Sequence, residues 1–263
     1  MRAARWASRA SPRKSTWCSA AARFASESLL KKPSDRRRAA APRKSAPIGI
    51  MGGTFDPVHF GHLRLAQEAV EILGLERVRW VPAGQPWHRG APRAPAVHRL
   101  EMVRLAIAKN ALFELDDAEI RQTAPGYTVE TLERLRNEFG PQRSLVLLLG
   151  TDAFRNLTSW ERWRDLFPLA HVFVAQRPGH SLTPGGMPAA LAAEWRKRAG
   201  TPDVLRERPG GNVVTYGTTA LDISASAIRA HFAQARSPRY LLPSAVLDYI
   251  EAHGLYAKES GAP

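Results

Sequence analysis

Cysteine is nearly absent from the sequence: Cys18 is the only one among 263 residues. A single thiol cannot form a disulfide within one chain, and cysteine-based zinc sites need several thiols. The composition therefore excludes a disulfide-stapled scaffold and a cysteine zinc module. It fits a protein of a reducing compartment, and we expect a cytoplasmic location.

Long hydrophobic runs are also missing. The longest run, residues 145–149, is bounded by Ser144 and Gly150. A helix that spans a bilayer needs about 18 or more consecutive apolar residues, so we expect no membrane segment. The run instead predicts a short strand that is buried on both faces.

Acidic residues are scarce near the N-terminus. Residues 1–46 hold 13 Lys and Arg but only 2 Asp and Glu, so most of the formal net charge of +14 belongs to this stretch. The other 217 residues hold 25 basic and 22 acidic residues. Because the body is nearly balanced, its composition does not favour a nucleic-acid-binding surface.

The first 46 residues are rich in Ala, Arg, Ser and Pro and lack periodicity, so we expect a disordered basic leader. Three interpretations stay open. The leader could be a non-functional extension from an upstream translation start, an organellar transit peptide, or a nucleic-acid-binding arm that uses residues 36–38 as phosphate contacts. The lack of an apolar h-region argues against secretion.

Residues 47–257 are expected to form one α/β domain, followed by a short tail at 258–263. Short apolar runs alternate with helical periodicity, which predicts βαβ units and a Rossmann-like, doubly wound parallel sheet with helices on both faces. Strands are expected at 48–51, 78–81, 113–115, 144–149, 171–175 and 212–216. Helices are expected at 63–73, 97–111, 128–139, 188–199, 225–235 and 243–253, with a further Trp-rich helical stretch around 160–167.

The sequence GGTFDPVHFGH, residues 52–62, joins the first expected strand to the first helix. Paired glycines let a backbone approach a phosphate, and a helix N-terminus offers free N–H donors to an anion. His59 and His62 are three residues apart and so share one face of the first turn. Gly61 leaves room for a nucleotide. A zinc pair would need a third ligand that is not found nearby, so we expect no metal site.

A second motif, ISASAIR at residues 223–229, precedes the last two helices. Ser224 suits a helix N-cap, and Ser226 and Arg229 then lie on the same side of the helix. A hydroxyl, free N–H groups and a guanidinium together make a phosphate site. Taken alone, the heptapeptide slightly favours a plain helix cap with a surface arginine. Its pairing with the first motif favours the phosphate site.

The first motif resembles the HxGH signature of the nucleotidyltransferase superfamily, and its longer form resembles bacterial nicotinate-nucleotide adenylyltransferases. The resemblance extends over nearly all of residues 47–257. It implies catalytic roles for His59, His62 and Arg229. It implies ATP contacts for Gly52, Gly53, Thr54, Phe55 and Ser226. The second motif departs from the family's ISSTxIR, because Ala225 replaces a serine and Ser226 a threonine.

Further site residues follow from the resemblance between the two motifs. The family has Pro-His-Lys or Pro-His-Arg beside the phosphates, which His88 and Arg89 match here, whereas Trp87 replaces the usual proline. Arg177 is implied on the ATP side of the cleft. The substrate side is implied to hold Gly84, Thr128, Asp152 at a ribose and Trp160 stacked on the pyridine ring. We expect Trp163 and the C-terminal tyrosines, including Tyr249 and Tyr256, to serve packing.

The reaction implied by the resemblance joins ATP to the 5′-phosphate of nicotinate mononucleotide, giving nicotinate adenine dinucleotide and pyrophosphate for NAD biosynthesis. The nucleophile is already an anion, so positioning and charge stabilisation are expected to carry catalysis. Mg²⁺ is expected on the ATP oxygens with few protein ligands. A homo-oligomer is compatible with the sequence.

Two other functions are alternatives. One is a different HxGH enzyme, a pantetheine-phosphate adenylyltransferase or a cytidylyltransferase, which the first motif does not separate. The pairs Tyr127-Thr128 and Asp152 with Trp160 favour nicotinate. The other is a nucleic-acid-binding protein that uses its basic leader, which the balanced charge of the body does not favour.

Overall fold

The computed structural model describes residues 45–86, 91–122, 124–176, 182–219 and 221–257. The predictions for the leader, the tail, Trp87, His88, Arg89 and Arg177 therefore lie outside the described residues, apart from residues 45 and 46 at the end of the leader. The described residues all belong to one compact unit. None of the described helices combines the length and the apolar character that crossing a membrane requires.

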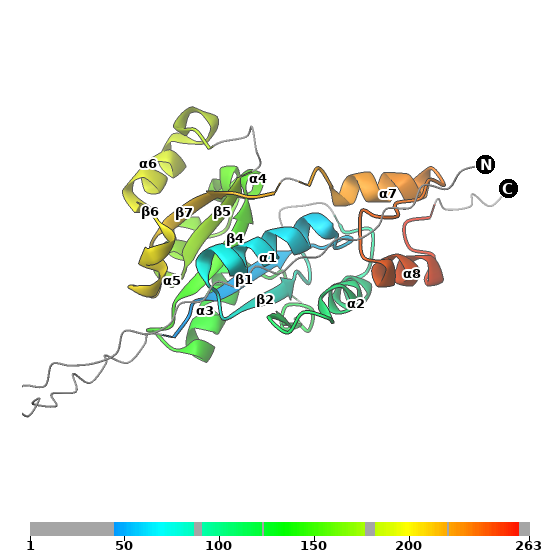
Figure 1. Cartoon of the computed structure of the whole chain (residues 1–263), viewed down its shortest axis with the longest axis horizontal. Coiled ribbons are helices and arrows are strands. Elements are labelled where there is room, and N and C mark those ends of the chain that lie inside the picture. Colours follow the sequence, from blue (N-terminus) through cyan, green and yellow to red (C-terminus); the bar gives the residue numbers. More distant parts are fainter. Residues whose placement is uncertain (1–44, 87–90, 123, 177–181, 220, 258–263) are drawn as a thin grey trace, which may run out of the picture. The chain divides into compact units, whose positions relative to one another are not determined.

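The described chain alternates strands and helices, as Figure 1 shows. Its strands are β1 (Ile48–Gly53), β2 (Arg77–Pro82), β3 (Phe113–Leu115), β4 (Leu145–Gly150), β5 (His171–Gln176), β6 (Ala199–Gly200) and β7 (Val213–Gly217). Its helices are α1 (Phe60–Leu73), α2 (Ala96–Ile107), α3 (Thr128–Phe139), α4 (Thr151–Arg155), α5 (Leu166–Leu169), α6 (Ala189–Arg198), α7 (Ala225–Ala233) and α8 (Ser244–Ala252).

All seven strands form one parallel sheet in the order β3-β2-β1-β4-β5-β7-β6. The chain first winds outward from β1 to β3 and then restarts at β4 on the other side of β1. The strand order therefore reverses between β1 and β4, the place where such sheets bind ligands at the carboxyl ends of their strands. The predicted doubly wound parallel sheet is confirmed.

Two hydrophobic cores cover the two faces of the sheet. Helices α1, α2 and α8 pack on one face, and α3, α4, α5 and α6 contribute to the core on the other. Strand β4 contributes side chains to both cores. Val146 and Leu148 belong to the first core, whereas Leu145, Leu147 and Leu149 belong to the second. Burial on both sides explains the continuous apolar run that predicted this strand.

The prediction of a helix over the Trp-rich stretch is wrong. The stretch is broken into two short 3-10 turns, Leu157–Ser159 and Trp163–Asp165, and the single turn of α5. Arg162 between them has φ of 47°, which a continuous α-helix does not allow. The break lets Trp163 enter the core, while Trp160 stays half-buried at a cavity. The short helix α4 and the two-residue strand β6 were not predicted either.

Candidate active site

A cavity of about 750 Å³ opens at the carboxyl ends of β1 and β4, where the strand order reverses. Residues of both sequence motifs line it, although more than 160 positions separate the two stretches. The shared lining comprises Gly52, Gly53, Thr54, Phe55, His59, His62, Ser226 and Arg229. The fold thus brings the two predicted phosphate-binding stretches into one place.

The two histidines of the first motif stack at the start of α1. His59 is the N-cap residue in extended conformation, and His62 lies in the first turn. Their ring centroids are 3.8 Å apart, and the His59 backbone N–H donates to Nδ1 of His62 at 3.3 Å. Because Nδ1 accepts a hydrogen bond, a neutral His62 carries its proton on Nε2 and can donate it to an anion.

Two glycines of the first motif have contrasting surroundings. A Cβ on Gly61 would lie 3.0 Å from Nδ1 of His59, so the glycine makes room first for the protein's own histidine. A Cβ on Gly52 would meet no protein atom within 4 Å. Gly52 thus leaves open space in the cavity lining, as a close approach by a phosphate requires.

The second motif caps α7, as predicted. Ser224 accepts a hydrogen bond from the Ala227 N–H at 3.2 Å, and its hydroxyl lies 3.1 Å from that of Ser226. Arg229 lies one turn further along the helix. Its Nη1 donates to the backbone carbonyl of Asp56 at 2.6 Å, which ties the two motifs together directly.

Asp56 is a hydrogen-bonding centre that the sequence analysis missed. Its carboxylate accepts the backbone N–H groups of Arg93 at 2.8 Å and Ala94 at 3.1 Å, and the Tyr256 hydroxyl at 2.7 Å. Its side chain is only 7% exposed, so these donors replace water around a buried charge. The one available signal was its place inside the first motif.

Arg99 on α2 is a second missed residue. It is 1% exposed and donates to three backbone carbonyls at the ends of β1 and β2, those of Thr54 at 2.8 Å, Ala83 at 2.6 Å and Gly84 at 2.7 Å. Burial lowers the pKa of its guanidinium. Arg99 therefore holds two cavity loops at a set distance from one another.

Comparison with known proteins identifies the family to which the chain belongs. A family model described as cytidylyltransferase-like matches residues 50–231. A probable nicotinate-nucleotide adenylyltransferase of Dechloromonas aromatica is 57% identical over 216 residues, covering 81% of this chain and 98% of that protein. A protein of the same name from Marinobacter nauticus is 46% identical over 207 residues, covering 79% and 95%. The chain belongs to the nicotinate-nucleotide adenylyltransferase family.

Solved structures agree in fold. Plasmodium falciparum nicotinic acid mononucleotide adenylyltransferase complexed with NaAD has a TM-score of 0.62 at 18% identity, covering 80% of this chain and 97% of that chain. The same enzyme complexed with APC gives a TM-score of 0.60 at 17% identity. The family resemblance seen in the motifs is confirmed, as is membership of an enzyme class, the nucleotidyltransferases.

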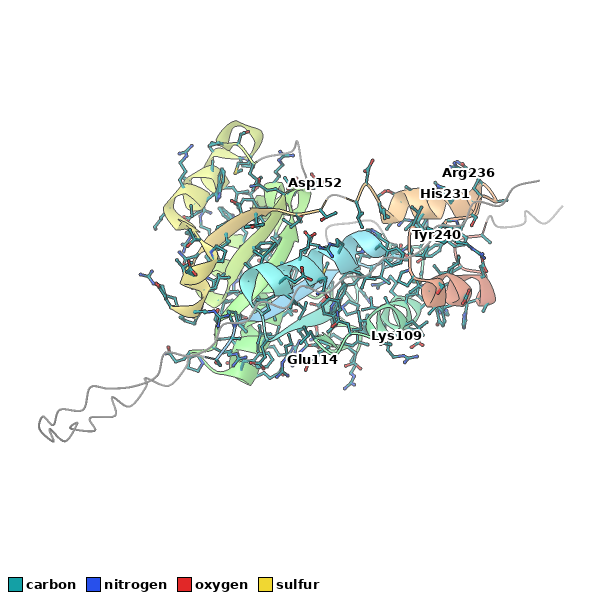
Figure 2. The ribbon with its side chains drawn as sticks, in the orientation of Figure 1. Lys109, Glu114, Asp152, His231, Arg236 and Tyr240 are labelled. Atoms are coloured by element: carbon teal, nitrogen blue, oxygen red, sulfur yellow. The ribbon has the colours of Figure 1, made fainter. Side chains whose placement is uncertain are left out.

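Three of the four predicted substrate residues line the same cavity. Thr128 at the start of α3, Asp152 in α4 and Trp160 all line it. Figure 2 labels Asp152 beyond the end of β4, where its side chain is 81% exposed. Gly84 is different, because it is buried and does not belong to the lining. A Cβ there would come within 2.2 Å of the Glu119 carbonyl oxygen, which makes Gly84 a close-packing position in this structure.

Glu119 is a third missed residue, and it also lines the cavity. Its carboxyl group is buried, and burial raises its pKa against the opposing effect of a hydrogen bond donated by Thr131. A carboxyl group with a raised pKa in a cleft is a candidate functional group. Nothing in the sequence distinguished it from the neighbouring acidic residues.

One cation that was not predicted also lines the cavity. Arg93 is exposed and lines the cavity, and it forms no ion pair within the described part of the chain. Within the described residues, no group of three His, Cys, Asp or Glu side chains is arranged to hold a metal ion.

Proposed function

We propose that the chain transfers the adenylyl group of ATP to the 5′-phosphate of nicotinate mononucleotide. A phosphate oxygen of the mononucleotide forms a bond to the α-phosphorus, the bond from that phosphorus to the bridging oxygen breaks, and pyrophosphate leaves. The products are nicotinate adenine dinucleotide and pyrophosphate. The observation that carries the proposal is the single cavity at the β1/β4 reversal, which both motifs line. The names of the relatives support the choice of substrate.

The ATP phosphates would lie at the first motif and α7. The backbone N–H groups of residues 52–55 and the N-terminus of α1 offer donors to phosphate oxygens. His59 and His62 would contact the α-phosphate, and Ser226 and Arg229 the departing pyrophosphate. Arg229 suits this role because one nitrogen is bound to the Asp56 carbonyl, which leaves its remaining N–H groups for phosphate.

Catalysis would depend on positioning and charge stabilisation rather than on a general base. The attacking phosphate is an anion and loses no proton. Aligning two bound reactants can lower a barrier by roughly 7–11 kcal/mol. The Nε2–H of His62 would donate to an α-phosphate oxygen as negative charge builds there, which is the same principle as an oxyanion hole.

Mg²⁺ enters this scheme with ATP as part of the substrate. Magnesium keeps several waters and binds through substrate phosphates, which agrees with a cavity that offers cations and N–H donors. Arg93 would add a further positive charge beside the phosphates.

The acceptor would lie at the opposite end. Trp160 would stack on the pyridine ring, and Thr128 would lie beside its carboxylate. Asp152 would accept hydrogen bonds from ribose hydroxyls. Gly84 would act from behind the cavity lining, by allowing the loop after β2 to pack closely on Glu119.

The test is an acceptor panel with the full chain. The protein is incubated with Mg²⁺ and ATP and, in separate reactions, nicotinate mononucleotide, nicotinamide mononucleotide or phosphopantetheine, and pyrophosphate and dinucleotide are measured. CTP replaces ATP in a parallel series. We expect the highest kcat/KM with ATP and nicotinate mononucleotide. Preference for another acceptor or for CTP would contradict the proposal.

A further inference from the structure

We propose that Tyr256 is a positioning residue for the adenylyl transfer, which orients Arg229 through Asp56. The inference rests on the proposed function, because its effect is measured as turnover. It concerns a residue that lies 27 positions beyond Arg229 and does not line the cavity.

Three contacts connect the tyrosine to the arginine. The Tyr256 hydroxyl donates to Oδ1 of Asp56 at 2.7 Å, and the backbone carbonyl of Asp56 accepts Nη1 of Arg229 at 2.6 Å. The same Nη1 lies 3.8 Å from Oδ2 of Asp56, beyond hydrogen-bond distance. The guanidinium is therefore bound to the carbonyl, while the carboxylate beside it is occupied by other donors.

The ring of Tyr256 also contacts the helix that carries Arg229. It packs against Phe232 with centroids 5.9 Å apart, and Phe232 lies three residues after Arg229 on α7. Tyr256 has φ of 64°, a conformation that is costly for a residue other than glycine. Such a conformation persists where surrounding contacts determine it, which the ring and hydroxyl contacts do here.

The hydroxyl matters because it compensates the Asp56 charge. Burial and the bond to Asp56 raise the pKa of Tyr256, so the hydroxyl stays protonated and remains a donor at neutral pH. Without it, Oδ1 of Asp56 would keep only the Ala94 N–H at 3.1 Å. The less compensated carboxylate would then attract Arg229 more strongly and compete with phosphate for the guanidinium.

The experiment compares Tyr256→Phe with a matched control, Tyr249→Phe, in the full chain. Tyr249 lies on α8, its hydroxyl is 2.9 Å from Nδ1 of His98, and it is not part of the cavity lining. We expect kcat/KM for Mg·ATP to fall about tenfold or more in Tyr256→Phe, as for loss of a hydrogen bond to a charged group. Tyr249→Phe should remain within about twofold of the parent.

A double-mutant cycle with Arg229→Ala separates positioning from a general structural effect. If Tyr256 acts through Arg229, adding Tyr256→Phe to Arg229→Ala causes no further loss, because coupled sites are non-additive. An equal loss in both backgrounds would overturn the proposal, and so would parent-like kcat/KM in Tyr256→Phe. A parent protein without adenylyl transfer would instead overturn the proposed function.

Discussion

Replacing Gly52 by alanine adds one methyl group at the end of β1, and its effects on stability and on turnover should have opposite signs. The new Cβ would meet no protein atom within 4 Å, and the backbone there is not left-handed. Such a change restricts the unfolded chain and stabilises a protein by about 0.4–1 kcal/mol. For a chain of this size, that corresponds to a rise in Tm of about 1–4 °C.

The same methyl group occupies cavity space. Gly52 lines the cavity, so the Cβ would stand where a phosphate approaches the backbone. Because a displacement of about 1 Å in a reacting group can cost about a hundredfold in rate, we expect kcat/KM for Mg·ATP to fall about that much. Stability and activity would thus move apart, which a general folding defect does not produce.

The control is Gly185→Ala. A Cβ on Gly185 also meets nothing within 4 Å, but this glycine lies in the 3-10 turn Pro184–Gly186, away from the cavity lining. It should keep parent turnover and a parent or slightly higher Tm. Differential scanning fluorimetry and steady-state kinetics provide both quantities. If Gly52→Ala kept kcat/KM within about threefold, or lowered Tm by several degrees, the reasoning would be refuted.

Two further predictions concern buried titratable groups. Burial raises the pKa of Glu119 in the folded state, so its contribution to the free energy of unfolding is favourable below the unfolded-state pKa and is lost as pH rises through the folded-state pKa. Glu119→Gln should therefore raise Tm at pH 7, and a lower Tm would contradict this. His171, bonded to the Arg208 carbonyl and the Asn212 N–H, has a pKa that burial lowers. The stabilising contribution of His171 is fully present above about pH 6.5 and declines as pH falls below that value. The free energy of unfolding, measured with urea between about pH 5 and 8, should therefore depend less on pH in His171→Gln than in the parent.

The sheet was predictable because its strands have simple surroundings. β4 is buried on both faces and reads as a continuous apolar run, β1 and β4 end at glycine, and β2 ends at proline. The two motifs were predictable because each combines local features, a glycine pair with histidines and a serine cap with an arginine. Their meeting in one cavity followed from the rule that ligands bind where strand order reverses.

The supporting contacts were not predictable, because they depend on pairs that are distant in sequence. Tyr256 bonds to a carboxylate 200 residues away, and Arg99 bonds to carbonyls that only the folded loops bring together. Tyr256 was expected to pack only; it does pack on Phe232, but it also donates a hydrogen bond. In each case the local sequence looked like an ordinary helix face or terminus.

The most direct test of the two-motif cavity as a catalytic site is the single-turnover rate of His62→Ala, measured beside its equilibrium Kd for ATP. His231→Ala serves as the control, since His231 bonds to the Ser237 carbonyl outside the cavity lining and is labelled near Arg236 in Figure 2. If His62 donates to charge that develops on the α-phosphate, the rate falls about 10²–10³-fold while Kd changes little. An unchanged rate, or a loss confined to ATP binding, would contradict the catalytic assignment.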